Sequence, residues 1–334
     1  MARPAVRRRA GRRLRDRPPR AAAGLHGALG AQGAAGRRAV TADARLGPGL
    51  ALAAAGSVAF SGKAIIVKLA YRHGVDAVTL IMYRMLFALP LFLALAWWAG
   101  RGQPPLARRD HLVVFGLGFT GYYLASFLDF AGLQYITASL ERLILYLNPT
   151  LVLLIGVLFM GQRVTPRQLL ALAVSYAGVL LVFGHEAKLT GPDTMLGAAL
   201  VFGSALSYAV YLSLSGQEVR RLGALRLTGW ASSVACVLCI LQFLMLRPLE
   251  AALVAPPVIW LSLLNALACT FAPVIMVMMA IERIGATLTA QTGMIGPLST
   301  ILMGVLLLGE PLNAWIVAGT ALVLAGVWLL ARAR

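Results

Sequence analysis

The sequence predicts an all-α integral membrane protein with ten transmembrane helices in two inverted five-helix repeats. Three observations predict it: the composition, ten long apolar segments and an internal repeat. Of the 334 residues, 60% are hydrophobic and only 13% are charged, whereas a soluble domain has about 45–50% apolar and about 25% charged residues. A globule of this size has too much surface to hide so many apolar side chains from water. The composition therefore indicates that most of the chain folds in lipid.

The apolar segments have the length of membrane-spanning helices. A helix rises 1.5 Å per residue, so about 20 apolar residues cross a hydrocarbon core of roughly 30 Å. Short runs with charges, glycine and proline separate the segments, such as residues 100–110 and 185–194. The predicted spans are 50–70, 78–99, 112–131, 138–160, 168–184, 195–215, 227–246, 257–280, 286–308 and 314–331. The fifth of these is the shortest.

The positive charge is concentrated ahead of the first span. The formal net charge is +18, and residues 1–46 alone hold 12 arginines against Asp16 and Asp43. This segment has no apolar periodicity and few aromatic residues, so it predicts a disordered basic cytoplasmic tail. Two interpretations remain open for it: a polybasic tail that binds anionic lipid, or sequence outside the native protein. Neither calls for a nucleic-acid partner.

The basic residues of the short loops predict the orientation. With the N-terminus inside, cytoplasmic loops and the C-terminal end carry 11 Lys and Arg residues beyond the tail, against three outside. Positive loops stay on the cytoplasmic side. We therefore expect a multi-pass protein of the bacterial-type inner (plasma) membrane, with both termini in the cytoplasm.

An internal repeat links the two halves. Residues 132–182 align with 280–330 at an offset of 148 residues without a gap, with about 14 of 51 positions identical. Prolines and glycines match within the predicted spans, including Pro149 with Pro297. Each half then holds five helices, and because five is odd the second half enters the membrane from the opposite side. Inverted repeats are the architecture of alternating-access transporters.

The repeated stretches resemble a known family. The segment from Gly132 to Glu141, followed by Asn148-Pro149 and Gly161, is similar to the fourth helix of EamA domains in the drug/metabolite transporter (DMT) superfamily. Residues 286–311 resemble the same region of a second domain. The resemblance also includes Gly56-Ser57, Lys68 and Tyr83-Arg84, and it covers residues 50–184 and 195–331 as two EamA-like domains. The family's glycine–glutamate pair is present as Gly309-Glu310, whereas the first copy reads Gly161-Gln162.

The resemblance implies transport of a small molecule such as an amino acid, another metabolite or a drug. We therefore expect a secondary active transporter, working as an exporter, with a small-molecule substrate and membrane lipid as partners. Coupling to protons or to exchange remains possible, and the oligomeric state is left open. An intramembrane enzyme and a channel-like membrane protein are the alternatives.

Charged residues at membrane depth define the candidate transport pathway, because such groups cost about 2.5–3.5 kcal/mol each at the helix centre and need a cavity or a partner. Five of them are predicted to lie at one level near the outer ends of the first four helices: Lys68, Arg84, Asp129, Glu141 and Arg142. They predict a polar vestibule. Each has a structural alternative as well, such as snorkelling for Lys68 and an ion pair with Asp129 or Glu141 for Arg84.

Further candidates lie deeper in the membrane. Lys63 is the deepest charge, near the middle of the first helix. Asn148 shares a helix face with Glu141, which favours Glu141 as a cavity residue with a role in proton coupling. In the second half Gln291 is a candidate substrate contact. Pro149 and Pro297 remove a backbone donor, so they predict equivalent kinks in the fourth and ninth helices.

Catalytic and metal motifs are not evident in the sequence. The CxxC of Cys236 and Cys239 lies within an apolar run and is best interpreted as buried small hydrophobic side chains. The four histidines lie in the tail, in loops or at helix edges, and a phosphate-binding loop is missing. We expect no metal, no cofactor and no enzymatic activity.

Overall fold

The computed structural model describes residues 21–161, 164–190 and 193–332. The chain divides into two compact units, residues 1–47 and 48–334. In the first unit the described part is the beginning of helix α1 (Ala21–Tyr71). The disordered tail expected for residues 1–46 stays a prediction of the sequence, and residues 1–20 lie outside the described part.

Helices make up the regular structure of the described residues, and ten of these stretches are long and apolar enough to span a membrane. The first half continues with α2 (Ala77–Gly100), α3 (Arg108–Gly118), the π-helix η1 (Phe119–Leu124), α4 (Ala125–Gly132), α5 (Ala138–Leu145), α6 (Asn148–Met160) and α7 (Pro166–Thr190). The second half holds α8 (Asp193–Leu222), α9 (Ala224–Leu246), the 3₁₀-helix η2 (Leu249–Ala252), α10 (Pro256–Ala266), the π-helix η3 (Leu267–Phe271), α11 (Ala272–Gly293), α12 (Ile295–Met303), the π-helix η4 (Gly304–Leu308) and α13 (Ala314–Arg332). The ten predicted spans are confirmed.

The two halves repeat each other in register. Helices α3 and α10 begin 148 residues apart, as do α7 and α13 and the π-helices η1 and η3. The offset found in the sequence therefore also relates the helices, down to a local irregularity in the third and eighth spans. Because each half contains five spans, the repeats cross the membrane in opposite directions.

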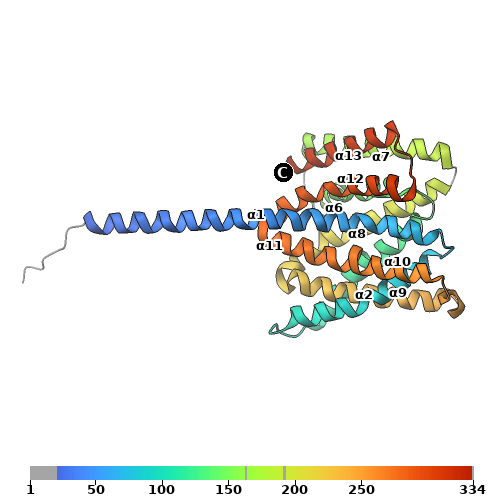
Figure 1. The fold of residues 1–334 in the computed structure, drawn as a ribbon, viewed down its shortest axis with the longest axis horizontal. Helices are drawn as coiled ribbons and strands as arrows, with labels where there is room; N and C mark the ends of the chain where they lie inside the picture. Colours follow the sequence, from blue (N-terminus) through green and yellow to red (C-terminus); the bar gives the residue numbers. More distant parts are fainter. Residues whose placement is uncertain (1–20, 162–163, 191–192, 333–334) are drawn as a thin grey trace, which may run out of the picture. The chain divides into compact units, whose positions relative to one another are not determined.

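Equivalent helices of the two repeats pack against each other. Figure 1 shows α7 beside α13 at one side of the bundle and α2 beside α9 at the other, and both pairs are in extensive contact. Glycine makes the first pairing possible: a Cβ atom at Gly178 would lie 2.6 Å from the carbonyl oxygen of Gly319. The second pairing is similar, since a Cβ atom at Gly229 would lie 2.8 Å from the backbone of Ala96. Small residues allow close helix approach where lipid provides no hydrophobic drive.

Several span boundaries differ from the prediction, and the sixth span runs to Leu222 rather than to residue 215. The fifth span continues to Lys188 rather than ending at residue 184. The prediction ended early because polar residues such as Glu186 follow the apolar run. The eighth and ninth spans divide at Gly285, whose φ of 79° and ψ of 161° are not helical and kink α11, so the eighth span ends at this residue rather than at residue 280. Glycine reaches this backbone conformation without steric cost.

The outer surface of the bundle is apolar. Large side chains such as Trp97, Trp260 and Leu253 are more than 60% exposed. A soluble protein exposes such groups only in small patches. Their abundance fits a surface covered by lipid.

Candidate transport site

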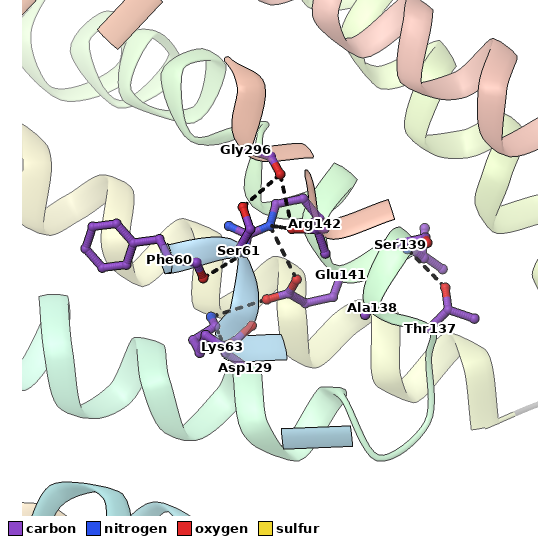
Figure 2. Close-up of polar contacts among 12 residues, drawn as sticks. Phe60, Ser61, Lys63, Asp129, Thr137, Ala138, Ser139, Glu141, Arg142 and Gly296 are labelled. Carbon is purple, nitrogen blue, oxygen red and sulfur yellow. Dashed lines mark hydrogen bonds and ion pairs between the residues drawn. The ribbon is translucent and has the colours of Figure 1, made fainter. Parts of the chain in front are cut away.

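A cluster of four charges lies where α1, α4 and α5 meet, and we call it the buried charge cluster: Lys63, Asp129, Glu141 and Arg142. The Lys63 ammonium donates a hydrogen bond to Asp129 Oδ2 and lies 3.2 Å from Glu141 Oε1. The Arg142 Nε atom lies 4.0 Å from Glu141 Oε2. Figure 2 shows the Glu141 carboxylate between the two cations. The cluster thus joins two positive and two negative groups from three helices.

Burial makes this cluster costly. The side chain of Glu141 is 0% exposed, that of Asp129 is 3% exposed and that of Lys63 is 15% exposed. Within the described residues, neither oxygen of Glu141 accepts a hydrogen bond, and Asp129 Oδ1 accepts none either. A buried carboxylate without hydrogen bonds is expensive in its charged form. Such a group is suited to binding and releasing a proton.

The fourth and ninth spans are both broken beside this cluster. In the fourth span the helix stops after Leu145 and resumes at Asn148, one residue before Pro149. In the ninth it stops after Gly293 and resumes at Ile295, two residues before Pro297. Proline lacks an N–H group, so it cannot donate to the carbonyl four residues earlier.

Side chains from the first repeat donate hydrogen bonds to backbone carbonyls at the second break. The carbonyl of Gly293 lies four residues before Pro297, and it accepts hydrogen bonds from Ser57 Oγ at 2.8 Å and Tyr146 Oη at 2.7 Å. Ser61 Oγ donates to the carbonyl of Gly296 at 2.8 Å. Arg142 reaches the same helix, since its Nε atom donates to Thr300 Oγ1 at 2.9 Å. The break in the second repeat is therefore held by side chains next to the charge cluster (Figure 2).

Arg84 lies apart from the four charges. An ion pair with Asp129 or Glu141 was one expectation, but Arg84 forms no ion pair within the described part of the chain. Its Nε atom donates to Thr270 Oγ1 at 2.9 Å, and its guanidinium lies 5.0 Å from the ring centre of Phe130. Thr270 belongs to the π-helix η3, whose irregular backbone brings this hydroxyl to the arginine. Arg84 therefore connects the second span with the eighth.

Lys68 lies at the end of α1, at a cavity of about 710 Å³. Its ammonium donates to the carbonyls of Leu133 and Ile136 at 3.1 and 3.0 Å, which follow α4. The cavity is also lined by Tyr71, Arg72, Asp76 and Gln134 and by Thr137 and residues 308–310. The vestibule predicted at this level thus divides into two places, a cavity with Lys68 and a buried cluster with Lys63.

Asp76 has a structural role at the rim of this cavity. Its carboxylate accepts hydrogen bonds from the N–H groups of Val78 and Thr79 as the N-cap of α2. Partial burial opposes ionisation, but the Thr79 hydroxyl, these N–H groups and Arg247 together hold the pKa of Asp76 below its usual value.

The remaining sequence candidates do not join the cluster. Asn148 is half-buried at the start of α6, and its Oδ1 atom accepts no hydrogen bond from the described residues. Gln291 is exposed near the end of α11. Thr292 and Ser299 donate to their own helix backbone four residues earlier, as expected for such residues. Gln162 lies outside the described residues.

Two acidic residues that the sequence analysis did not select meet at the start of α5. Glu310 accepts hydrogen bonds from the N–H groups of Ala138 and Ser139, at 2.7 and 3.2 Å. Glu186, at the end of α7, accepts one from the Thr137 hydroxyl. The signal for Glu310 was the glycine–glutamate pair of the family pattern, Gly309-Glu310. Nothing in the sequence indicated that Glu186 lies here.

The described residues contain no group of three or more His, Cys, Asp or Glu side chains that is able to hold a metal ion. Cys236, Cys239 and Cys269 are buried free thiols, and Cys236 packs against Met85.

Comparison with known proteins decides the family. The model of the EamA-like transporter family matches the chain twice, over residues 47–184 and 195–332. The chain belongs to the EamA family. The uncharacterized transporter YcbK of Bacillus subtilis is 31% identical over 77% of this chain and 84% of its own length. An uncharacterized transporter of Archaeoglobus fulgidus is 25% identical over 81% of this chain and 92% of its own length.

Two further likenesses are narrower. The chloramphenicol-sensitive protein RarD of Pseudomonas aeruginosa is 33% identical over 39% of this EamA chain and 47% of its own length. A crystal structure that is 18% identical shares the fold with a TM-score of 0.58, over 85% of this chain and 97% of its own. The protein is therefore a membrane transporter of the EamA family, with a small-molecule substrate and a lipid environment.

Proposed function

We propose that this EamA protein is a secondary active exporter that moves a small metabolite such as an amino acid, or a drug, by alternating access. The buried charge cluster carries the proposal. It holds four ionisable groups at membrane depth, next to the breaks in the fourth and ninth spans. Ionisable groups are retained at such depth mainly for substrate and ion pathways.

Glu141 is the residue we propose for proton coupling. Its carboxylate is fully buried and holds both Lys63 and Arg142 by charge alone, without a hydrogen bond from the described residues. A proton on Glu141 removes both attractions. Since Lys63 is on α1 and Glu141 is on α5, protonation then alters how firmly these two helices are joined. A proton gradient is in this way converted into a helix displacement.

The proposed orientation and location rest on the loop charges. The excess of Lys and Arg in alternate loops supports cytoplasmic termini in the inner membrane. The end of the bundle with Lys68 and Glu310 then faces away from the cytoplasm. The four charges of the cluster balance when both carboxylates are ionised, which suits a zwitterion as well as a neutral compound.

Transport into reconstituted vesicles tests the proposal. The full-length protein is placed in liposomes and offered a panel of the amino acids and chloramphenicol, which is included because of the name of the relative RarD. Uptake and efflux are measured with and without a proton gradient. We expect at least one compound to move faster with the gradient, in the direction opposite to the protons.

Glu141→Gln and Glu250→Gln form the matched pair of variants. Glu250 is exposed in η2, so its variant controls for the loss of one carboxylate. We expect Glu141→Gln to reduce gradient-driven flux at least about tenfold, equal to about 1.4 kcal/mol, and Glu250→Gln to leave it unchanged. Equal coupled flux in both variants contradicts the role of Glu141, and single-channel currents in planar bilayers contradict a carrier.

A further inference from the structure

Glu310 crosses from the second repeat to the first. It follows Gly309, which ends η4 with a φ of 72°, a left-handed conformation that favours glycine. The Glu310 N–H group donates to the carbonyl of Gly304 at 3.1 Å, which turns the chain back over the helix end. A Cβ atom at Gly304 would lie 2.8 Å from Glu310 Oε2. The carboxylate therefore passes over a glycine on its way to α5.

Three donors at the first turn of α5 receive this carboxylate. Glu310 Oε1 accepts from the Ala138 N–H at 2.7 Å, and Oε2 accepts from the Ser139 N–H at 3.2 Å and the Ser139 hydroxyl at 2.7 Å. The first N–H groups of a helix have no partner within it and carry partial positive charge. A carboxylate there makes strong charge-assisted hydrogen bonds.

The contact of Glu310 with α5 lies between the cavity and the buried charge cluster. Glu310 and Thr137 line the 710 Å³ cavity, whereas Glu141 and Arg142 lie one turn further along α5 in the buried charge cluster. The first turn of α5 therefore stands between the cavity and the cluster. Ala138 and Ser139 are 0% and 1% exposed, so this turn is closed to solvent.

A second contact between the repeats lies on the same cavity. Arg72, at the end of α1, donates to the carbonyl of Leu308 at 2.7 Å. Arg72 and Leu308 also line the cavity. Two bonds between the repeats thus lie at the cavity, and of these two the one from Glu310 is made to α5, the helix that carries Glu141 and Arg142.

We infer that Glu310 is a latch that closes the path between the cavity and the buried charge cluster by binding the first turn of α5. Opening toward this end of the bundle then requires the Glu310 carboxylate to leave the Ala138 and Ser139 donors, which releases the first turn of α5 from the second repeat while Arg142 still bonds to Thr300 deeper in the bundle. The inference rests on the proposed alternating access, and it assigns to one residue the closure at this end.

Thiol labelling tests the latch. Ser61→Cys places a reporter in α1 beside Gly296; Ser61 is 0% exposed and lies seven residues deeper than Lys68. The reporter is labelled in membrane vesicles with a membrane-impermeant methanethiosulfonate. The unsubstituted chain gives the background rate, since its cysteines at 236, 239 and 269 are buried. Glu250→Cys, at the same end as Glu310, identifies the vesicle face that exposes this end.

Glu310→Gln in the reporter chain is expected to raise the labelling rate from that face at least about tenfold. Ser139→Ala removes one of the three donors without touching Glu310, and we expect a smaller rise in the same direction. Glu250→Gln is the matched control and is expected to leave the rate unchanged. Ser139→Ala keeps the test decisive if Glu310→Gln fails to fold, which size-exclusion chromatography reports.

Rates equal to the control in both variants overturn the latch. Labelling needs neither substrate nor gradient, so this result refutes the latch even where the wild-type flux is coupled to protons. Faster labelling in a protein whose flux proves uncoupled refutes the proposed coupling and leaves the latch standing.

Discussion

Lys63 is the group whose removal is expected to disturb the protein most, because it serves two buried carboxylates. At 3.2 Å and an effective dielectric constant of about 20, its attraction to Glu141 alone amounts to about 5 kcal/mol. Much of that gain is offset by desolvation in the intact cluster. In Lys63→Met the carboxylates of Asp129 and Glu141 stay buried but lose the attraction of the lysine. Removing one partner of a buried ion pair lowers the free energy of unfolding by about 3–5 kcal/mol.

The loss is measurable as the free energy of unfolding in mixed detergent micelles, followed by circular dichroism. Lys188→Met makes the same substitution at an exposed lysine and is expected to change this free energy by less than about 0.5 kcal/mol. Lys63→Met with Asp129→Asn leaves Glu141 beside Arg142, so the double variant is expected to be more stable than the single one. A cost below about 1 kcal/mol for Lys63→Met, or a double variant no better than the single one, refutes this reasoning.

Other predictions concern packing, capping and the tail. Gly178→Leu is expected to destabilise the bundle by about 1–3 kcal/mol or more, because a Cβ atom there meets the Gly319 carbonyl. Gly184→Leu is the control and is expected to cause no such loss, since the space around Gly184 is open. Equal unfolding free energies of the two variants would contradict the packing of α7 on α13. Asp76→Ala is expected to cost about 0.5–2 kcal/mol at neutral pH through loss of the α2 cap. The pKa of Asp76 is lowered in the folded protein, so its stabilisation is present above the ordinary aspartate pKa of about 3.9 and is lost as the pH falls through the folded value. The difference in melting temperature between wild type and Asp76→Ala should therefore shrink in acid, and a constant difference would argue against the cap. Deleting residues 2–46 should leave vesicle transport at the wild-type rate, and loss of transport in a correctly inserted protein would show that the tail is needed.

The spans and their repeat could be predicted from the sequence because both depend on local sequence pattern. Apolar length fixes which segments cross the membrane, and matched glycines and prolines carry the offset of 148 residues that the helices follow. The division between the eighth and ninth spans was also predictable, because a glycine between two apolar runs readily takes a non-helical conformation, and Gly285 does so.

The site was predicted only in part, because burial and rotation about helix axes decide which charges meet. Asp129, Glu141 and Arg142 were expected at one level, and the structure adds Lys63 to them rather than Lys68. Lys68 lies five residues further along α1, about 7.5 Å at a rise of 1.5 Å per residue, and binds carbonyl groups there. Glu310 lies 172 residues from its partner Ala138. A contact of that separation leaves no trace in a local sequence pattern.

Alternating access, in which the bundle opens at one end while it closes at the other, is tested most directly by measuring a distance at each end in one experiment. One pair of spin labels, at His73 and Leu312, reports the end with Glu310. A second pair, at Gln103 and Arg220, reports the opposite end. All four positions are exposed. Pulsed electron resonance measures both distances in the wild type and in Glu141→Gln, which mimics a protonated Glu141, with Glu250→Gln as the control. We expect Glu141→Gln to lengthen the distances at one end while shortening them at the other, and Glu250→Gln to match the wild type. Distances that stay unchanged in Glu141→Gln, or that lengthen at both ends together, would contradict alternating access driven from the buried charge cluster.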